Sequence, residues 1–329
     1  EIHWRDWSSD VCSSDLVVVV KATFTIHEDG RLTLADQQLP PLLAPEYHGV
    51  DGASSLRYEA DLVPPKPGTD VVLNGHAHAP RGRAVTSVAV ALGVGSHRKI
   101  LQVTGDRVYR RTLVGTVVPS APAPFVRMPI VYERAYGGHD TAAANPAEHT
   151  LFTPNPVGTG LVVRRAALVG RPVANVEHPG TALGHHGAAG FGAICSHWSP
   201  RRELAGTYDT RWIATRKPLL PEDFDPRFHM HAPLDQQHVP HLRGGVPIEL
   251  VNLTPGGVLR FSLPKIWLAF RTRIALPRGE HVREHRAKLH TLVLEPDHPR
   301  VLMVWHTSLP CTHDAESLED TTVWEKPYR

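Results

Sequence analysis

Prolines and glycines interrupt this chain at short intervals along its whole length. The 329 residues include 30 prolines and 26 glycines, and these are scattered along the chain. A proline inside a helix removes a backbone hydrogen bond and clashes with the preceding turn, so long helices cannot form between such closely spaced breaks. The sequence therefore favours short strands joined by turns.

The segments that we expect to be strands alternate apolar and polar residues with a period of two. Turn-forming sequences separate them, among them HEDG at 27–30, TPGG at 254–257 and EPDHPR at 295–300. The expected strands lie within residues 17–26, 31–34, 71–80, 84–95, 98–111, 245–264, 266–276, 288–309 and 321–326. The pattern predicts an all-β fold of antiparallel, sandwich-like sheets, in which 71–80, 84–95 and 98–111 follow one another as a meander or sandwich sheet.

The middle of the chain, residues 121–232, lacks this periodicity and is rich in Pro, Gly, His, Trp and Tyr. We expect a loop-rich insert there, between an N-terminal β region (17–120) and a C-terminal β region (233–329) of one composite domain. So long an irregular stretch is either functional or held in place by aromatic anchors. Its helix candidates are residues 209–215 and a turn near 221–224.

Residues 1–16, EIHWRDWSSDVCSSDL, show neither helical nor strand periodicity. From Asp6 to Asp15 they match one reading frame of a common short-read sequencing adapter. We therefore interpret residues 1–16 as a non-native segment and exclude it from fold reasoning. On this interpretation the native chain is truncated, its first strand begins at Val17 without an upstream partner, and Trp4 and Trp7 are not buried.

Composition argues against several classes of function. The formal net charge is +2 and no stretch is dense in Lys and Arg, so we expect no nucleic-acid partner. No apolar run approaches the roughly 18–20 residues of a membrane helix. Cys12 lies in the excluded segment. The two remaining cysteines, Cys195 and Cys311, are distant in sequence and give neither a disulfide framework nor a zinc motif, which favours a reducing, cytoplasmic location.

Histidine pairs are the main argument for an enzyme. His76 and His78 in GHAHAP would share one face of a strand and could begin a metal site. No aspartate follows at the position that dinuclear hydrolases use, and no His-Glu-x-x-His motif occurs, so we expect histidines satisfied by their surroundings and no cofactor. Cys195 and His197 are close in sequence, but a catalytic dyad is defined by geometry rather than by adjacency. A metal-dependent or carbohydrate-active β-sandwich enzyme that uses His76 and His78 stays open as the alternative function.

Aromatic and arginine side chains recur in and beside the irregular section. They either pin a long loop onto the sheets or form a partner-binding face, because buried aromatics and arginines dominate protein interfaces. The candidates for partner binding are Trp198, Tyr208, Trp212, Phe228, Arg134, Arg211 and Arg227.

Several ordered motifs of the chain together resemble the family named domain of unknown function 2169. They include VVLNGHAHAP (71–80), MPIVYERAYGG (128–138), GFGAICSHWSPR (190–201), AGTYDTRW (205–212) and LRGGVPIELVNLTPGG (242–257). Proteins of this family are encoded beside type VI secretion genes and are regarded as adaptors or chaperones. They help to load toxic effectors, often with PAAR-like tips, onto the VgrG spike. The resemblance implies an intracellular, non-enzymatic protein that binds an effector and possible spike components, and it implies no catalytic residues.

Overall fold

The computed structural model describes residues 3–10, 13–163, 165–181, 187–276, 279–311 and 318–327, with the backbone alone for those before Leu16. Within these residues the chain is all-β, as the sequence predicts, and α1 (Thr210–Thr215) is the one α-helix. No helix of the described part is long and apolar enough to cross a membrane.

The first sheet has seven strands. In order across the sheet they are β1 (His3–Asp10), β2 (Ser13–Ile26), β24 (Arg300–Cys311), β23 (Lys288–Glu295), β6 (Thr69–Leu73) and β18 (Gln237–His238), with β3 (Leu32–Leu34) also paired to β2. The predicted hairpins at HEDG and EPDHPR are confirmed, because they join β2 to β3 and β23 to β24. Strand β6 runs parallel to β23 on one side and antiparallel to β18 on the other.

The second sheet has five strands. Their order is β17 (Val176–Glu177), β9 (His97–Thr104), β8 (Ser87–Val94), β19 (Pro247–Val251) and β20 (Val258–Ser262). The expected meander is therefore wrong for residues 71–80, since β6 belongs to the first sheet. Every residue of β6 is buried. This is typical of a strand that is paired in parallel and covered on both faces, whereas a strand with one face in solvent would alternate buried and exposed residues.

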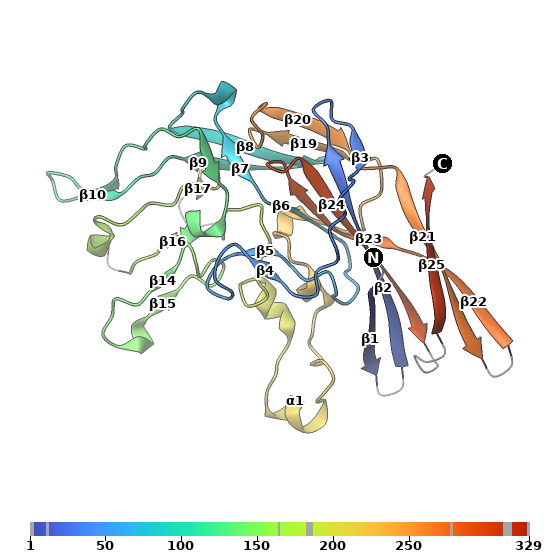
Figure 1. Ribbon diagram of the computed structural model, residues 1–329. Helices are drawn as coiled ribbons and strands as arrows, with labels where there is room; N and C mark the ends of the chain where they lie inside the picture. The colour runs from blue at the N-terminus through green and yellow to red at the C-terminus, as the bar shows by residue number, and fades with distance from the viewer. Residues whose placement is uncertain are drawn as a thin grey trace.

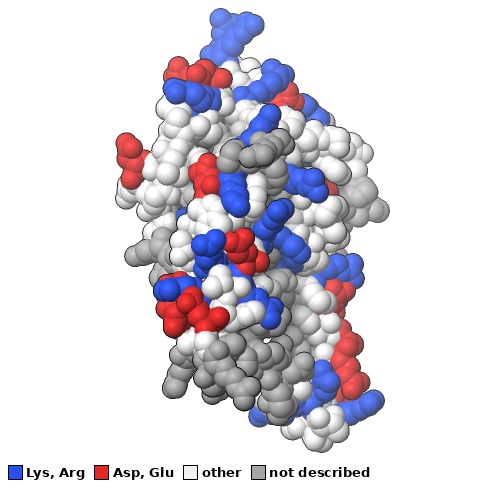
Figure 2. Space-filling model, turned by 90° about the vertical axis from the view of Figure 1, so that its right-hand side faces the viewer, with Lys and Arg blue, Asp and Glu red and all other residues white. Residues whose placement is uncertain are grey.

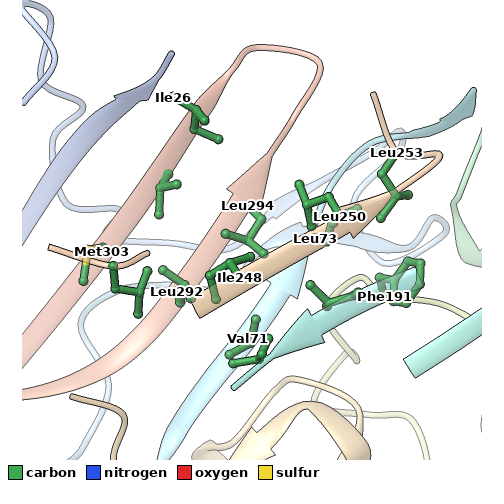
Figure 3. Close-up of a cluster of buried hydrophobic side chains, with 14 of the residues drawn as sticks. Ile26, Val71, Leu73, Phe191, Ile248, Leu250, Leu253, Leu292, Leu294 and Met303 are labelled. Carbon is green, nitrogen blue, oxygen red and sulfur yellow. The ribbon is translucent and has the colours of Figure 1, made fainter. Parts of the chain in front are cut away.

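The core lies between these two sheets (Figures 1 and 3). Leu292 and Leu294 of β23 and Met303 of β24 belong to the same buried cluster as Ile248 and Leu250 of β19. The two packed sheets form the sandwich that the alternating sequence predicts.

A third sheet flanks the sandwich at the right of Figure 1. Its order is β22 (Gly279–Arg286), β21 (Ile266–Leu276) and β25 (Leu318–Pro327). Leu268, Phe270 and Ile274 of β21 join the main core. The sequence did not indicate β22, because GEHVREHR is almost wholly exposed and lacks apolar alternation.

The remaining elements are short. The paired strands are β4 (Glu46–Tyr47) with β5 (Leu56–Tyr58), β7 (His76–His78) with β12 (Arg127–Pro129), β10 (Tyr109–Arg111) with β11 (Val117–Pro119), β13 (Tyr136–Gly137) with β16 (Thr159–Gly160), and β14 (His139–Asp140) with β15 (Thr150–Leu151). The 3-10 helices are η1 (Pro80–Gly82), η2 (Tyr132–Arg134), η3 (Pro146–Glu148), η4 (Arg165–Leu168), η5 (Arg201–Ala205), η6 (Pro226–His229) and η7 (Leu234–Gln236). The described part of residues 121–232 holds no strand longer than three residues, which confirms the predicted loop-rich insert.

The first strand begins earlier than the sequence predicts. β2 starts at Ser13, and Leu16 lies in the core beside Val18 because alternate residues share a face. β1 pairs with β2 and occupies the edge of the sheet, so β2 is not left without an upstream neighbour. The prediction for Trp4 and Trp7 concerns side chains outside the described part.

Candidate partner-binding arm and cleft

A segment of the irregular section projects from the body of the molecule. We call residues 206–226 the arm; α1 lies at its tip, and two extended stretches connect it to the sandwich (Figure 1). Loops carried on a rigid scaffold are common places for binding residues.

Local hydrogen bonds give the arm its shape. Asp209 caps α1 by accepting a hydrogen bond from the backbone N–H of Trp212 at 2.8 Å, and the Trp212 indole N–H donates to the Leu219 carbonyl at 2.8 Å. At the base, the Thr207 hydroxyl donates to Asp223 at 2.7 Å. The predicted helix at 209–215 and the turn at 221–224 are both confirmed.

The arm presents apolar and cationic side chains to solvent. Tyr208 packs edge-on against Trp212 with ring centroids 4.8 Å apart, and it remains 51% exposed. Ile213 and Leu220 are 58% and 49% exposed. The side chain of Arg211 is 80% exposed and lies 4.0 Å from Glu222. Exposed apolar groups rimmed by charges are typical of protein interaction sites.

A cleft of about 470 Å³ lies where the arm joins the body. Its apolar lining is formed by Pro154, Ala188, Ile194, Pro200, Leu204, Met230, Ala232, Pro233 and Leu234. Lys99, Arg201, Arg227 and Asp235 supply its charged groups. Leu204 and Arg227 lie just before and just after the arm in sequence, so the arm and the cleft share a boundary.

Arg201 makes the floor of the cleft rigid. Its guanidinium donates to the carbonyls of Phe228 at 2.7 Å and Ile194 at 2.9 Å, and to Glu59 at 2.5 Å. It also lies over the Phe228 ring, 5.3 Å from the centroid. Burial raises the pKa of Glu59, but the charges of Arg201 and His231 and the hydrogen bonds from Arg201 and the Ala60 backbone together leave that pKa below its ordinary value. A fully paired buried cation of this kind fixes a surface rather than recognising a free anion.

A second buried ion pair supports the wall of the cleft. The Asp70 carboxylate accepts hydrogen bonds from Lys66 Nζ at 2.8 Å and from the backbone N–H groups of His231 and Ala232 at 3.0 Å each. Burial raises the pKa of Asp70, yet Lys66 and these donors hold it below its ordinary value. Because Ala232 lines the cleft, Asp70 fixes the position of that wall.

The structure separates the sequence-predicted residues into groups. Tyr208, Arg211 and Trp212 come together on the arm, while Arg227 and Phe228 lie at its base. Arg227 is held by hydrogen bonds to the Asp225 carboxylate.

Two candidates lie elsewhere. Trp198 is fully buried and packs edge-on against Tyr132 at 5.6 Å between ring centroids, so it is a loop anchor without a free surface. Arg134 hydrogen-bonds Asp106 at 3.0 Å and Asn175 at 3.1 Å, outside the arm. Sequence reasoning missed Ile213 and Leu220, although Ile213 directly follows the predicted candidate Trp212 in the expected helix.

His76 and His78 share a face, as the strand pattern predicts. Both contact the Asp297 carboxylate, His76 Nδ1 at 2.7 Å and His78 Nε2 at 3.0 Å, and Arg127 lies 3.2 Å from the same group. Burial raises the pKa of Asp297, but the two histidines and Arg127 lower it to about 2. In the described residues, no group of three or more His, Cys, Asp or Glu side chains is arranged to hold a metal ion.

Cys195 and His197 do not form a nucleophilic pair. Cys195 is buried, and burial raises the pKa of its thiol to about 12. His197 Nε2 instead accepts a hydrogen bond from the Trp198 indole at 3.1 Å. The thiol therefore stays protonated at neutral pH.

Buried histidines make the stability of the fold dependent on pH. Burial lowers the pKa of His306 to about 3 and that of His231 to about 4, from 6.5 in an exposed ring. His290, stacked on His306 at 4.2 Å, is shifted in the same direction. The unfolded chain therefore binds more protons than the folded chain below pH 6.5, and stability falls as the pH drops from there toward about 4.

We expect thermal unfolding measured across this range to show a falling Tm below about pH 6.5. In His306→Phe, which has no ring proton to gain, the fall should be smaller. A Tm that stays constant down to about pH 4 would contradict this assignment.

The architecture defines an all-β protein that carries its candidate binding surface on an irregular insert. Comparison with family models matches residues 13–306 to the family described as "Uncharacterized protein conserved in bacteria (DUF2169)". The chain belongs to this family, and the match spans the arm, the cleft and the sandwich apart from β1 and the end of β24. No curated protein and no solved structure matches the chain.

Proposed function

We propose that this protein is a non-enzymatic, cytoplasmic adaptor or chaperone of type VI secretion. It binds an effector through the PAAR-like tip or the adjoining linker and helps to load the effector onto the VgrG spike. Family membership and the motif resemblance support the choice of system. The observation that carries the binding role is the arm, which projects apolar and cationic side chains beside an apolar cleft.

The chemistry of the arm suits a partner with exposed apolar groups. Tyr208 offers a large aromatic surface, and Ile213 and Leu220 extend it with aliphatic side chains. Burying such groups against a partner removes apolar surface from water on both sides. The cleft can receive an apolar side chain of the partner, and its floor is already ordered by Arg201, so little entropy is lost on binding.

Substitutions on the arm test this role. Tyr208→Ala should weaken binding by about 2 kcal/mol, roughly thirtyfold in Kd, because it removes an interface anchor. Ile213→Asp combined with Leu220→Asp should abolish co-purification with the proposed effector, since binding would bury two carboxylates in an apolar contact. Calorimetry and co-elution of the co-expressed pair measure the two effects.

Leu113→Asp provides the matched control. Leu113 is fully exposed in the turn between β10 and β11, away from the arm in the chain, and its replacement should leave binding unchanged. The arm would be excluded as the binding surface if its variants kept both the wild-type melting temperature and the wild-type affinity for the effector.

A further inference from the structure

The outer face of the third sheet carries two tryptophans among cations. On β21, Leu268 and Phe270 point into the core, so Trp267 and Arg271 lie on the opposite face. The register sets Lys326 of β25 opposite Trp267. We call Trp267, Trp324, Arg271, Arg286 and Lys326 the tryptophan face. Figure 2 views the molecule from the side of this sheet and shows basic and acidic side chains interspersed there.

The cations are held close to the indole rings. The Arg286 guanidinium lies 4.3 Å from the centroid of Trp267, and Lys326 Nζ lies 5.2 Å from it. Lys326 is also 5.4 Å from the Trp324 ring, which Arg271 approaches at 5.6 Å. Cation–π attraction at these distances restricts where the charges lie.

Two of the cations form no ion pair within the described residues. Arg271 pairs with Glu284 at 2.7 Å, and on the same sheet Arg273 pairs with Asp320. Arg286 and Lys326 form no ion pair with any residue that the structure describes. One end of the face therefore holds two positive charges beside one indole, and neither is in an ion pair within the described residues, although the charge of Lys326 adds to the lowering of the Glu284 pKa by Arg271.

We propose that the tryptophan face binds an extended acidic segment of a protein partner, with carboxylates at alternate positions pairing with Arg286 and Lys326. Alternate residues of an extended chain project to one side and are roughly 6.6 Å apart, which suits two cations that share one indole. The indole supplies apolar surface for the stems of the acidic side chains. This surface is separate from the arm, and β25 lies outside the matched residues 13–306.

Charge distribution favours an acidic peptide over a nucleic acid. The same sheet carries Glu280, Glu284 and Asp320, which would repel a continuous phosphate chain. The net charge of the whole chain is only +2. Two unpaired cations match a short acidic motif, whereas strands of nucleic acid are bound by longer tracts of basic residues.

Fluorescence anisotropy with a labelled peptide of alternating Glu and Thr tests the proposal on the full chain. We expect salt-sensitive binding, and about tenfold weaker binding by the double variant Arg286→Ala, Lys326→Ala. Arg111→Ala, which removes an exposed cation on β10, should bind like the wild type. The arm variant with Ile213→Asp and Leu220→Asp should also bind normally, which separates this site from the effector-binding role.

Four results would overturn the proposal. The first is that the wild type does not bind the Glu–Thr peptide, and the second is that the double variant binds it as tightly as the wild type does, with an unchanged melting temperature. The third is that the wild type binds a matched Lys–Thr peptide as tightly as the Glu–Thr peptide. The fourth is that the wild type binds labelled oligothymidylate more tightly than the Glu–Thr peptide. The last of these would assign the face to single-stranded nucleic acid.

Discussion

Replacing Asp70 by alanine is expected to lower the free energy of unfolding by about 3–5 kcal/mol. The carboxylate is fully buried and accepts three hydrogen bonds, from Lys66 Nζ and from the backbone of His231 and Ala232. Its removal leaves the Lys66 ammonium buried without its counter-charge and two backbone donors without an acceptor. Urea unfolding at neutral pH measures the effect.

Two comparisons make the Asp70 test specific. Asp29→Ala removes an exposed carboxylate that lies 3.8 Å from the Arg31 side chain and accepts a hydrogen bond from the Arg31 backbone at 2.9 Å, and it should cost no more than about 1 kcal/mol. Adding Lys66→Met to Asp70→Ala should recover part of the loss, because the unpaired charge is then removed as well. A cost for Asp70→Ala as small as that of Asp29→Ala would mean that this ion pair does not hold the wall of the cleft.

Trp198→Ala is the second substitution with a large expected effect, about 3–5 kcal/mol of unfolding free energy. The indole is fully buried, packs edge-on against Tyr132, and lies where the backbone of Ser199 donates to the Thr153 carbonyl. The alanine variant therefore loses apolar burial, leaves a cavity and releases a contact between two irregular segments. Differential scanning calorimetry measures this loss.

Trp212→Ala is the matched comparison for Trp198→Ala. Trp212 is half-buried on the arm, so its loss should lower global stability much less and partner binding more. At a temperature below the lowered Tm of the Trp198→Ala variant, the folded variant should bind the effector with wild-type affinity. If Trp198→Ala weakened binding without changing stability, its assignment as a loop anchor would be wrong.

Local patterns predicted those parts of the fold that local interactions determine. HEDG and EPDHPR form hairpins because their residues favour turns whatever surrounds them. Residues 209–215 form a helix because Asp209 caps it. The pairing of β6 with β23 joins residues near 70 to residues near 291, and no local pattern encodes a contact of that sequence separation.

The candidate site could be predicted only in part. Sequence grouped Trp198 with Tyr208 and Trp212, since all three lie in the same irregular section, but tertiary packing buries the first and exposes the second. The cleft was not predictable, because its walls come from Lys99, Ile194 and Met230, which converge only in the folded chain.

Hydrogen exchange of the protein alone and in complex with its effector tests the central claim most directly. If the arm and cleft bind the effector, amides of residues 206–226 and of the segment around Met230 should exchange more slowly in the complex. Leu113 and its neighbours in the turn between β10 and β11 should exchange as in the free protein. Unchanged exchange in the arm and cleft, together with protection at another surface, would contradict the account.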